Sequence, residues 1–275
     1  MAEVDRLLAP RSALRGLVSG IFTETGRHGP MLFPATPSPS LTIFLCGASI
    51  HEDGRAFAHS LLAGPQGRAR WASMLPGTAF VTALFRPGAL PRVLVPGGLP
   101  QMDEAGELAA FLPQAEADAL VQAVRRHGSM AGAVAALEDW LLARTARPPR
   151  RRGGDLWLPP AAIAMPIAAV AAGTGRSPRQ AERLFRQTFG ASQRDLRALL
   201  RYGRMLGGLL AGTATHGLGA AALDCGYYDQ AQMARDMRRF AGLSAREVAA
   251  AARGGGGPAL SMFRYGEGER RLLLG

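Results

Sequence analysis

The chain has 275 residues, of which 48% are apolar, so it can bury a sizeable core in one or two domains. All 32 basic residues are arginine, against 21 acidic residues and 2 cysteines, which excludes a disulfide framework and favours a reducing compartment. The sequence shows no secretory leader and no apolar stretch of the roughly 20 residues that a spanning helix needs, so we expect a soluble cytoplasmic protein.

The charge is distributed unevenly along the chain. Residues 1–145 hold 12 arginines and 12 acidic residues, whereas residues 146–253 hold 17 arginines and 7 acidic residues. The absence of lysine, with many alanines and glycines, indicates GC-rich coding, so the distribution of arginine is more informative than its abundance. A neutral half joined to a strongly basic half predicts a polyanionic partner for the C-terminal half.

The N-terminal part predicts a small β-rich unit. A short helix is expected near residues 4–8. Short apolar runs bounded by proline and glycine follow from residue 31 to about residue 94, such as LTIFLCGASI (41–50) and GTAFVTALFRPG (77–88). That spacing is typical of strands and turns.

Nothing in this unit nominates an enzyme. His28, His51 and His59 are scattered without a His-x-His pair, so a solvated loop is favoured over a metal site. No nucleophile elbow, Walker loop or dinucleotide fingerprint is present. Cys46 lies in an apolar run and is expected to be a small core residue. We therefore expect no metal and no cofactor, and the default ligand is a small molecule in an apolar cavity.

Residues 103–145 change to helical spacing, with a break at Gly128 and Ser129. This helical pair either packs on the β-rich unit or mediates dimerisation, and both alternatives stay open. Residues 146–155, rich in arginine, proline and glycine, are predicted to be a linker, and residues 254–275, which begin GGGGP, a loose tail.

The basic half contains an internal repeat. The stretch SPRQAERLFRQTF (177–189) superposes on DQAQMARDMRRF (229–240) when it is shifted by 52 residues. Each copy opens with a residue that can cap a helix, carries an arginine six residues later, and ends in Gly-x-Ser, which can close one helix and cap the next. The matched positions are Ser177 and Asp229, Arg183 and Arg235, Gly190 and Gly242, and Ser192 and Ser244.

Each copy predicts a helix-turn-helix unit, because a short apolar helix and a tight turn precede the capped basic helix. The apolar face of the basic helix should pack inward, so that polar residues of its first turns can reach base edges in a major groove. A linking helix over residues 192–211 would span roughly 28 Å. That is close to the roughly 34 Å between major-groove faces one turn apart, so one monomer could read two successive grooves.

The segments IAAVAAGTGRSPRQAERLFRQTFGASQRDL and ALDCGYYDQAQMARDMRRFAGLSAREV resemble the C-terminal domain of AraC/XylS-type transcriptional regulators, over residues 156–253. The resemblance implies an all-α tandem helix-turn-helix domain that binds double-stranded promoter DNA in a bacterial cytoplasm. Matching positions imply base contacts from Arg179, Glu182, Arg183, Gln230, Ala231 and Arg235, further DNA contacts from Arg186 and Arg194, and helix N-termini at Ser177, Ser192, Asp229 and Ser244 presented to phosphates.

Residues 1–145 are similar to the β-rich, cupin-like sensor domains of such regulators, mainly through FRPG (85–88). The predicted fold class is α+β, a β-rich domain with a helical appendage followed by the all-α domain. We expect residues 1–145 to control the DNA-binding half through a small-molecule effector or a partner, and a homodimer is a further possibility.

Two other functions stay open. A DNA-repair alkyl acceptor could carry the same module, but it needs a reactive cysteine. Alternatively, a degenerate module could act in protein assembly, because the second unit is weaker. Gly203, Gly207 and Gly208 lie in the linking helix, and the segment 212–220 is poor in apolar residues.

Five side chains of the basic half have a structural alternative. Tyr227 and Tyr228 are expected to pack the second turn, and Cys225 to lie in the core. Arg183 and Arg235, if they do not contact DNA, would lie on a solvated helix face or form ion pairs with Glu182 or Asp236.

Overall fold

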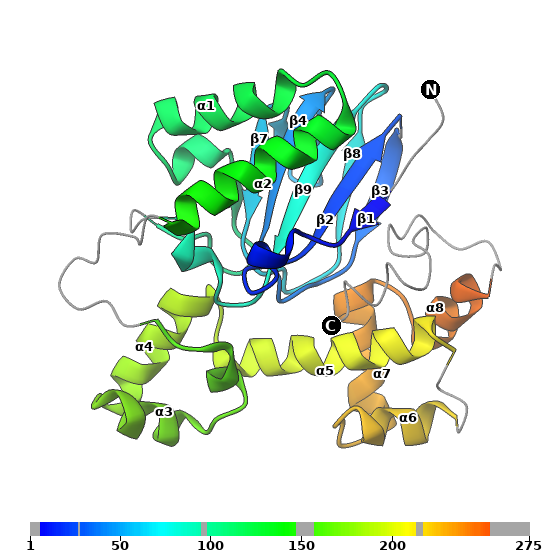
Figure 1. Ribbon diagram of the computed structural model, residues 1–275. Coiled ribbons are helices and arrows are strands. Elements are labelled where there is room, and N and C mark those ends of the chain that lie inside the picture. The colour runs from blue at the N-terminus through cyan, green and yellow to red at the C-terminus, as the bar shows by residue number, and fades with distance from the viewer. Residues whose placement is uncertain (1–5, 27, 95–97, 147–156, 213–216, 254–275) are drawn as a thin grey trace.

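The computed structural model describes residues 6–26, 28–94, 98–146, 157–212 and 217–253 (Figure 1). The predicted linker lies outside these ranges except for Ala146, which ends a helix, and the predicted tail lies wholly outside them. Within the described residues an antiparallel β domain precedes an all-α domain, which confirms the predicted α+β class.

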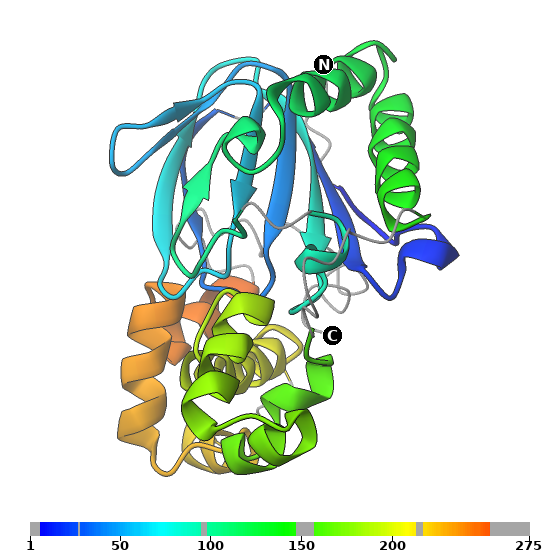
Figure 2. The same cartoon turned by 90° about the vertical axis from the view of Figure 1, so that its left-hand side faces the viewer.

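Two antiparallel sheets face each other in the β domain (Figure 2). The first has the strand order β1 (Arg6–Leu8), β2 (Val18–Thr25), β9 (Ala79–Phe85), β4 (Ser40–Cys46), β7 (Ser60–Ala63) and β10 (Ala105–Gly106). The second has the order β3 (Gly29–Phe33), β8 (Arg70–Met74), β5 (Ser49–His51) and β6 (Ala56–Phe57). Short 3₁₀ helices at Ser12–Leu14, Leu90–Arg92 and Leu108–Ala110 connect the strands and helices.

The helix expected near residues 4–8 is wrong. Residues 6–8 form β1, which pairs with β2 in the register Leu7 to Phe22. Leu7 is buried between the two sheets, and this tertiary contact decides the conformation of a segment that is too short to hold a helix.

Strands of the first sheet are buried on both faces, which explains their nearly continuous apolar sequence. In β4, Phe44 faces the second sheet in a cluster with Phe22, Phe80 and Met31. The alternate residue Ile43 faces the other way, in a second cluster that includes the helical pair.

The helical pair packs on the β domain, which was one of the two alternatives that the sequence left open. Helices α1 (Gln114–Arg125) and α2 (Met130–Ala146) cover the outer face of the first sheet (Figure 1). Their fully buried residues include Val124 and Leu137, which share a cluster with Ile43.

Cys46 is exposed, so its predicted core position is wrong. The register between β4 and β9 shifts between Phe44 and Cys46, which marks a β-bulge. Strict alternation would place Cys46 on the same face as Phe44, but the extra residue of the bulge breaks that alternation. The Cys46 thiol instead donates a hydrogen bond to the carbonyl oxygen of Gly77 at 3.1 Å.

The all-α domain follows a short 3₁₀ helix at Pro160–Ile163. Its helices are α3 (Ile167–Thr174), α4 (Pro178–Phe189), α5 (Gln193–Leu210), α6 (Leu218–Asp224), α7 (Gln230–Ala241) and α8 (Ala245–Ala252). Figure 1 shows α5 running along the underside of the β domain, with α3 and α4 at one end and α6 and α7 at the other. The largest fully buried side chains of the all-α domain are those of Tyr202, Phe185 and Phe240.

We predict that Leu137→Ala lowers the free energy of unfolding by about 2–5 kcal/mol, because the leucine is fully buried between α2 and the first sheet. Leu223→Ala, at a position that is 61% exposed, should change it by no more than about 0.5 kcal/mol. Urea unfolding of both variants measures the difference. Similar small losses in both would contradict the placement of α2 on the sheet.

Candidate nucleic-acid interface

The first helix-turn-helix unit is formed by α3 and α4. Helix α3 ends at Gly175, whose φ of 62° places it in the left-handed region that glycine tolerates. Ser177 then caps α4, since its hydroxyl accepts from the Gln180 backbone N–H at 3.4 Å while the Gln180 side chain accepts from the Ser177 N–H at 2.9 Å. This reciprocal capping box fixes where the basic helix begins.

The second unit, α6 and α7, repeats this design. Asp229 caps α7 by accepting from the Gln232 backbone N–H at 2.6 Å. Both basic helices have 12 residues, and both end at a left-handed glycine, Gly190 with φ of 70° and Gly242 with φ of 72°. Ser192 and Ser244 then cap the following helices, α5 and α8. The repeat in the sequence is therefore a repeat in the structure.

Burial sorts the side chains of both basic helices as the amphipathic pattern predicts. Leu184 and Phe185 of α4, and Met233 and Met237 of α7, lie in the core of the all-α domain. The residues expected to contact bases lie on the exposed faces, as do two further predicted DNA contacts. The exposed residues are Arg179, Glu182, Arg183 and Arg186 on α4, Gln230, Ala231 and Arg235 on α7, and Arg194 on α5.

The predicted ion-pair alternatives are not observed. Among the described residues, no salt bridge involves Arg183 or Arg235. Asp236 instead faces Arg201 of α5 at 3.5 Å, and the guanidinium of Arg201 lies 5.0 Å from the ring centre of Tyr227. This partly buried group ties α7 to α5 and leaves Arg235 on the outer surface.

Helix α5 joins the two units without a break. Its 18 residues span about 27 Å at 1.5 Å per residue. It continues through Gly203, Gly207 and Gly208, which the sequence analysis expected to lower the stability of this helix. Tyr202 is buried in the middle of α5 and packs on Phe240 of α7 with ring centres 5.2 Å apart.

The two adjacent tyrosines of the second turn have different environments. Tyr227 is buried, as expected, and burial raises the pKa of its hydroxyl well above the usual value. Tyr228 is 89% exposed, so its predicted packing is wrong. Its backbone N–H donates to the Gln232 side chain at 3.0 Å, which directs the residue outward just before the Asp229 cap. An aromatic residue next to a helix cap was the one signal in the sequence for this position.

A cavity of about 490 Å³ lies between the two sheets of the β domain. Its walls are mainly apolar and include Phe44 and Leu84, while Tyr202 and Leu206 of α5 lie along its edge. The Ser49 hydroxyl on its wall is buried and has no hydrogen-bond partner among the residues that the structure describes.

Titratable groups also line this cavity. His51 lines it, and burial lowers the pKa of that imidazole below its ordinary value, which favours the neutral ring at pH 7. Arg70 also lines it and pairs with Asp103 at 3.1 Å. The sequence suggested an apolar cavity but gave no sign that a helix of the C-terminal domain would form part of it.

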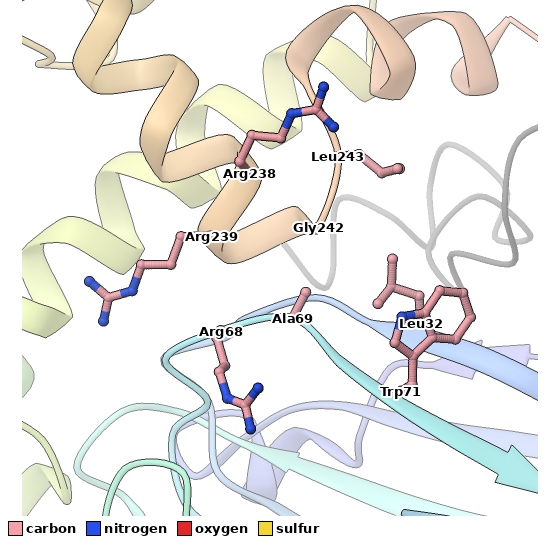
Figure 3. A pocket seen from close by; sticks show the side chains of 8 residues that line it. All are labelled: Leu32, Arg68, Ala69, Trp71, Arg238, Arg239, Gly242 and Leu243. Carbon is pink, nitrogen blue, oxygen red and sulfur yellow. The ribbon is translucent and has the colours of Figure 1, made fainter. Parts of the chain in front are cut away.

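A second hollow lies where the end of α7 meets the β domain (Figure 3). Leu32, Ala69 and Trp71 line it from the β domain, and Arg238 and Gly242 from the α domain. Arg238 forms a salt bridge with Glu247 of α8 at 3.1 Å.

No helix in the described part of the chain is long and apolar enough to cross a membrane. The described residues also contain no group of three or more histidine, cysteine, aspartate or glutamate side chains placed to hold a metal ion.

We predict that Ser177→Ala lowers the free energy of unfolding by about 1 kcal/mol, because it removes the side-chain acceptor at the start of α4. Gln187→Ala, at an exposed position in the last turn of the same helix, serves as the control and should cost no more than about 0.5 kcal/mol. Chemical denaturation compares the two, and equal losses would contradict the capping role.

A family model described as a helix-turn-helix domain matches residues 170–251. A comparison with curated proteins found no match. Among solved structures, the chain is similar to ToxT from Vibrio cholerae O395, with 9% identity, a TM-score of 0.40, and coverage of 82% of this chain and 96% of ToxT. ToxT from Vibrio cholerae strain SCE256 with a bound unsaturated fatty acid shows 8% identity, a TM-score of 0.38, and coverage of 82% and 95%. The AraC-like transcriptional activator CuxR shows 14% identity, a TM-score of 0.29, and coverage of 69% and 72%.

The matched residues run from Val170 in α3 to Ala251 in α8 and so include both capped basic helices. The chain therefore carries an AraC-type helix-turn-helix domain over residues 170–251, which confirms the resemblance of its C-terminal half.

Proposed function

We propose that the chain is a transcriptional regulator that binds double-stranded promoter DNA by inserting α4 and α7 into two successive major grooves. The observation that carries this proposal is that the chain contains two helix-turn-helix units of the same design. Two capped basic helices bury their apolar faces in one core and expose every side chain that was expected to contact bases. In this proposal residues 1–145 form a domain for sensing or dimerisation, and residues 156–253 form the DNA-binding domain.

Each exposed group has a distinct task in this proposal. Arginine can donate two parallel hydrogen bonds to guanine, so Arg183 and Arg235 are proposed to read bases with Arg179, Glu182 and Gln230. Ala231 offers its methyl group, which suits contact with the methyl of thymine. Arg186 and Arg194 would bind nearby DNA, Arg194 through phosphate, which adds affinity without sequence information.

The helix caps are proposed to meet the DNA backbone. Ser177, Ser192, Asp229 and Ser244 each begin a helix, where free backbone N–H groups and the positive end of the helix dipole attract phosphate. Tyr228 joins this set because its exposed ring precedes the Asp229 cap and its hydroxyl can donate to a phosphate oxygen.

The β domain is proposed to bind a small effector in the cavity between its sheets. The cavity volume and its mainly apolar walls fit a small molecule, and the Ser49 hydroxyl, which has no partner within the described part of the chain, offers it a hydrogen bond. Because Tyr202 and Leu206 of α5 lie at the same cavity, an effector there would touch the helix that joins the two DNA-reading units.

An alkyl-acceptor activity has less support. A reactive thiol needs a lowered pKa in an electropositive setting. Burial instead raises the pKa of the Cys225 thiol. Cys46 is exposed, and its thiol donates a hydrogen bond to the Gly77 carbonyl at 3.1 Å; among the described residues no salt bridge or cation–π contact places a basic group beside it. We therefore propose a non-enzymatic regulator.

The test of DNA reading compares Arg183→Ala with Arg194→Ala on a site selected from random duplex DNA. Arg183→Ala should cost about 1–3 kcal/mol of discrimination between the selected site and random DNA. Arg194→Ala should weaken binding to both alike and reduce the slope of log affinity against log salt by about 1. Equal effects of both variants on specific and random DNA would refute the role given to Arg183.

The test of effector binding is a search for small molecules that raise the melting temperature of the full chain. At a concentration about 100 times its dissociation constant, such a molecule should stabilise the fold by about 2.7 kcal/mol. Leu84→Trp places a large ring in the cavity and should remove the effect, whereas Ile50→Trp on the exposed side of β5 should retain it. A molecule that stabilises both variants equally does not bind in this cavity.

A further inference from the structure

The β domain holds the C-terminal ends of both basic helices through backbone hydrogen bonds. The Met102 N–H donates to the Gly190 carbonyl, just past the end of α4, at 2.6 Å. The Ala35 N–H donates to the Phe240 carbonyl of α7 at 2.7 Å, and the Ala69 N–H donates to the Arg239 carbonyl at 3.0 Å. Three separate loops of one domain thus meet the two helices that are proposed to read DNA.

At α4, close packing accompanies the hydrogen bond. The ring of Phe189 lies against Gly88, where an added Cβ atom would come within 2.6 Å of the ring. Gly190 lies against Pro65 and the Pro100 carbonyl in the same way. Only a glycine at position 88, with φ of 77°, permits this approach. The FRPG turn therefore packs directly against the end of α4.

At α7, the β domain satisfies carbonyls that a helix end leaves free. Phe240 and Arg239 are in the last turn of α7, and both accept from the β domain. The Arg239 side chain returns a hydrogen bond to the Gly67 carbonyl at 3.1 Å. Figure 3 shows the end of α7 at Gly242 lying over Leu32 and Ala69, and Leu32 belongs to the core cluster of the α domain.

These contacts leave the proposed reading surface free. They involve the last residues of α4 and α7, whereas Arg179, Arg183, Gln230 and Arg235 lie in earlier turns and are exposed. The β domain therefore orients the helices without covering the side chains that would meet DNA.

The linking helix alone gives weaker control of the distance between the two units. Each of Gly203, Gly207 and Gly208 costs a helix up to about 1 kcal/mol relative to alanine. All three lie in the second half of α5, between the units. The β domain connects α4 and α7 a second time, because its backbone hydrogen bonds hold the C-terminal ends of both helices. This connection adds to the one that α5 provides.

We propose that the β-domain segments at residues 32–36, 64–69, 88 and 100–102 form a brace that sets the separation of α4 and α7. The brace thereby selects the spacing between the two blocks of the DNA site, and Leu32 and Met102 are its positioning residues. This inference rests on the proposed function. The brace loops at Ala35 and at residues 64–66 also line the cavity between the sheets, so an occupant of that cavity would act on the same spacing.

The experiment uses the full chain and the two-block site selected by the native protein. A series of duplexes carries the same blocks with their separation shortened or lengthened by one or two base pairs, and affinity is measured for each. For the native chain, each departure from the selected spacing should cost about tenfold or more in affinity. In the variant Leu32→Ala/Met102→Ala, both changes lie in the β domain, and the penalty should fall to about threefold.

A matched control separates the brace from general destabilisation. Leu120→Ala/Met130→Ala removes the same two side-chain types from the contact between the helical pair and the first sheet. It should keep the native spacing preference, and affinity for random DNA should be equal in all three proteins.

If the native chain selects no site at all, the proposed function fails and the brace with it. If the native chain selects a two-block site but the Leu32→Ala/Met102→Ala variant keeps the full spacing penalty, the brace alone is refuted. A loss of spacing preference in the control as great as in that variant would also refute it.

Discussion

The arrangement of the C-terminal domain depends on one constraint, which is that α4 and α7 must bury their apolar faces in a single core built around α5. Phe185 fills this core from one side and Phe240 from the other, where it packs on Tyr202. Removing these large side chains from water fixes the rotation of each helix about its axis. The exposed arginines follow from that rotation, because a helix that buries one face must present the opposite one.

Local chemistry then sets where each helix begins and ends. The caps at Ser177 and Asp229 and the left-handed glycines at 190 and 242 are short-range features, and the sequence alone predicted all four. Burial of the apolar faces was predictable for the same reason, since it follows from helical periodicity. The repeat at a shift of 52 residues made both predictions stronger, because each copy supported the other.

Features that depend on distant residues were not predictable in this way. The bulge that exposes Cys46 arises from its pairing with β9, more than 30 residues later in the chain. The strand at Leu7 is set by burial between two sheets. Tyr228 faces solvent while its neighbour Tyr227 is buried, because the turn before α7 places them on opposite sides. No local pattern in the sequence encodes the first two outcomes, and for Tyr228 the sequence offers one local signal, an aromatic residue next to a helix cap.

The contacts between the domains belong to the same class. The hydrogen bonds from Ala35, Ala69 and Met102 to the ends of the basic helices join loops to helices across more than 80 residues of sequence. The sequence predicted two domains with separate tasks. The structure shows an α domain whose core includes Leu32 of the β domain, and a cavity of the β domain that borders α5. Sensing and DNA reading are thus proposed to share one set of contacts.

Whether one monomer reads both blocks is tested most directly by methylation protection at guanine N7, in the major groove of the selected duplex, with the number of bound chains determined in the same samples. One chain should protect two unlike segments on one face of the DNA, with centres about 10 base pairs apart. A single protected segment, or two symmetric segments that require two chains, would contradict reading by α4 and α7 of one monomer.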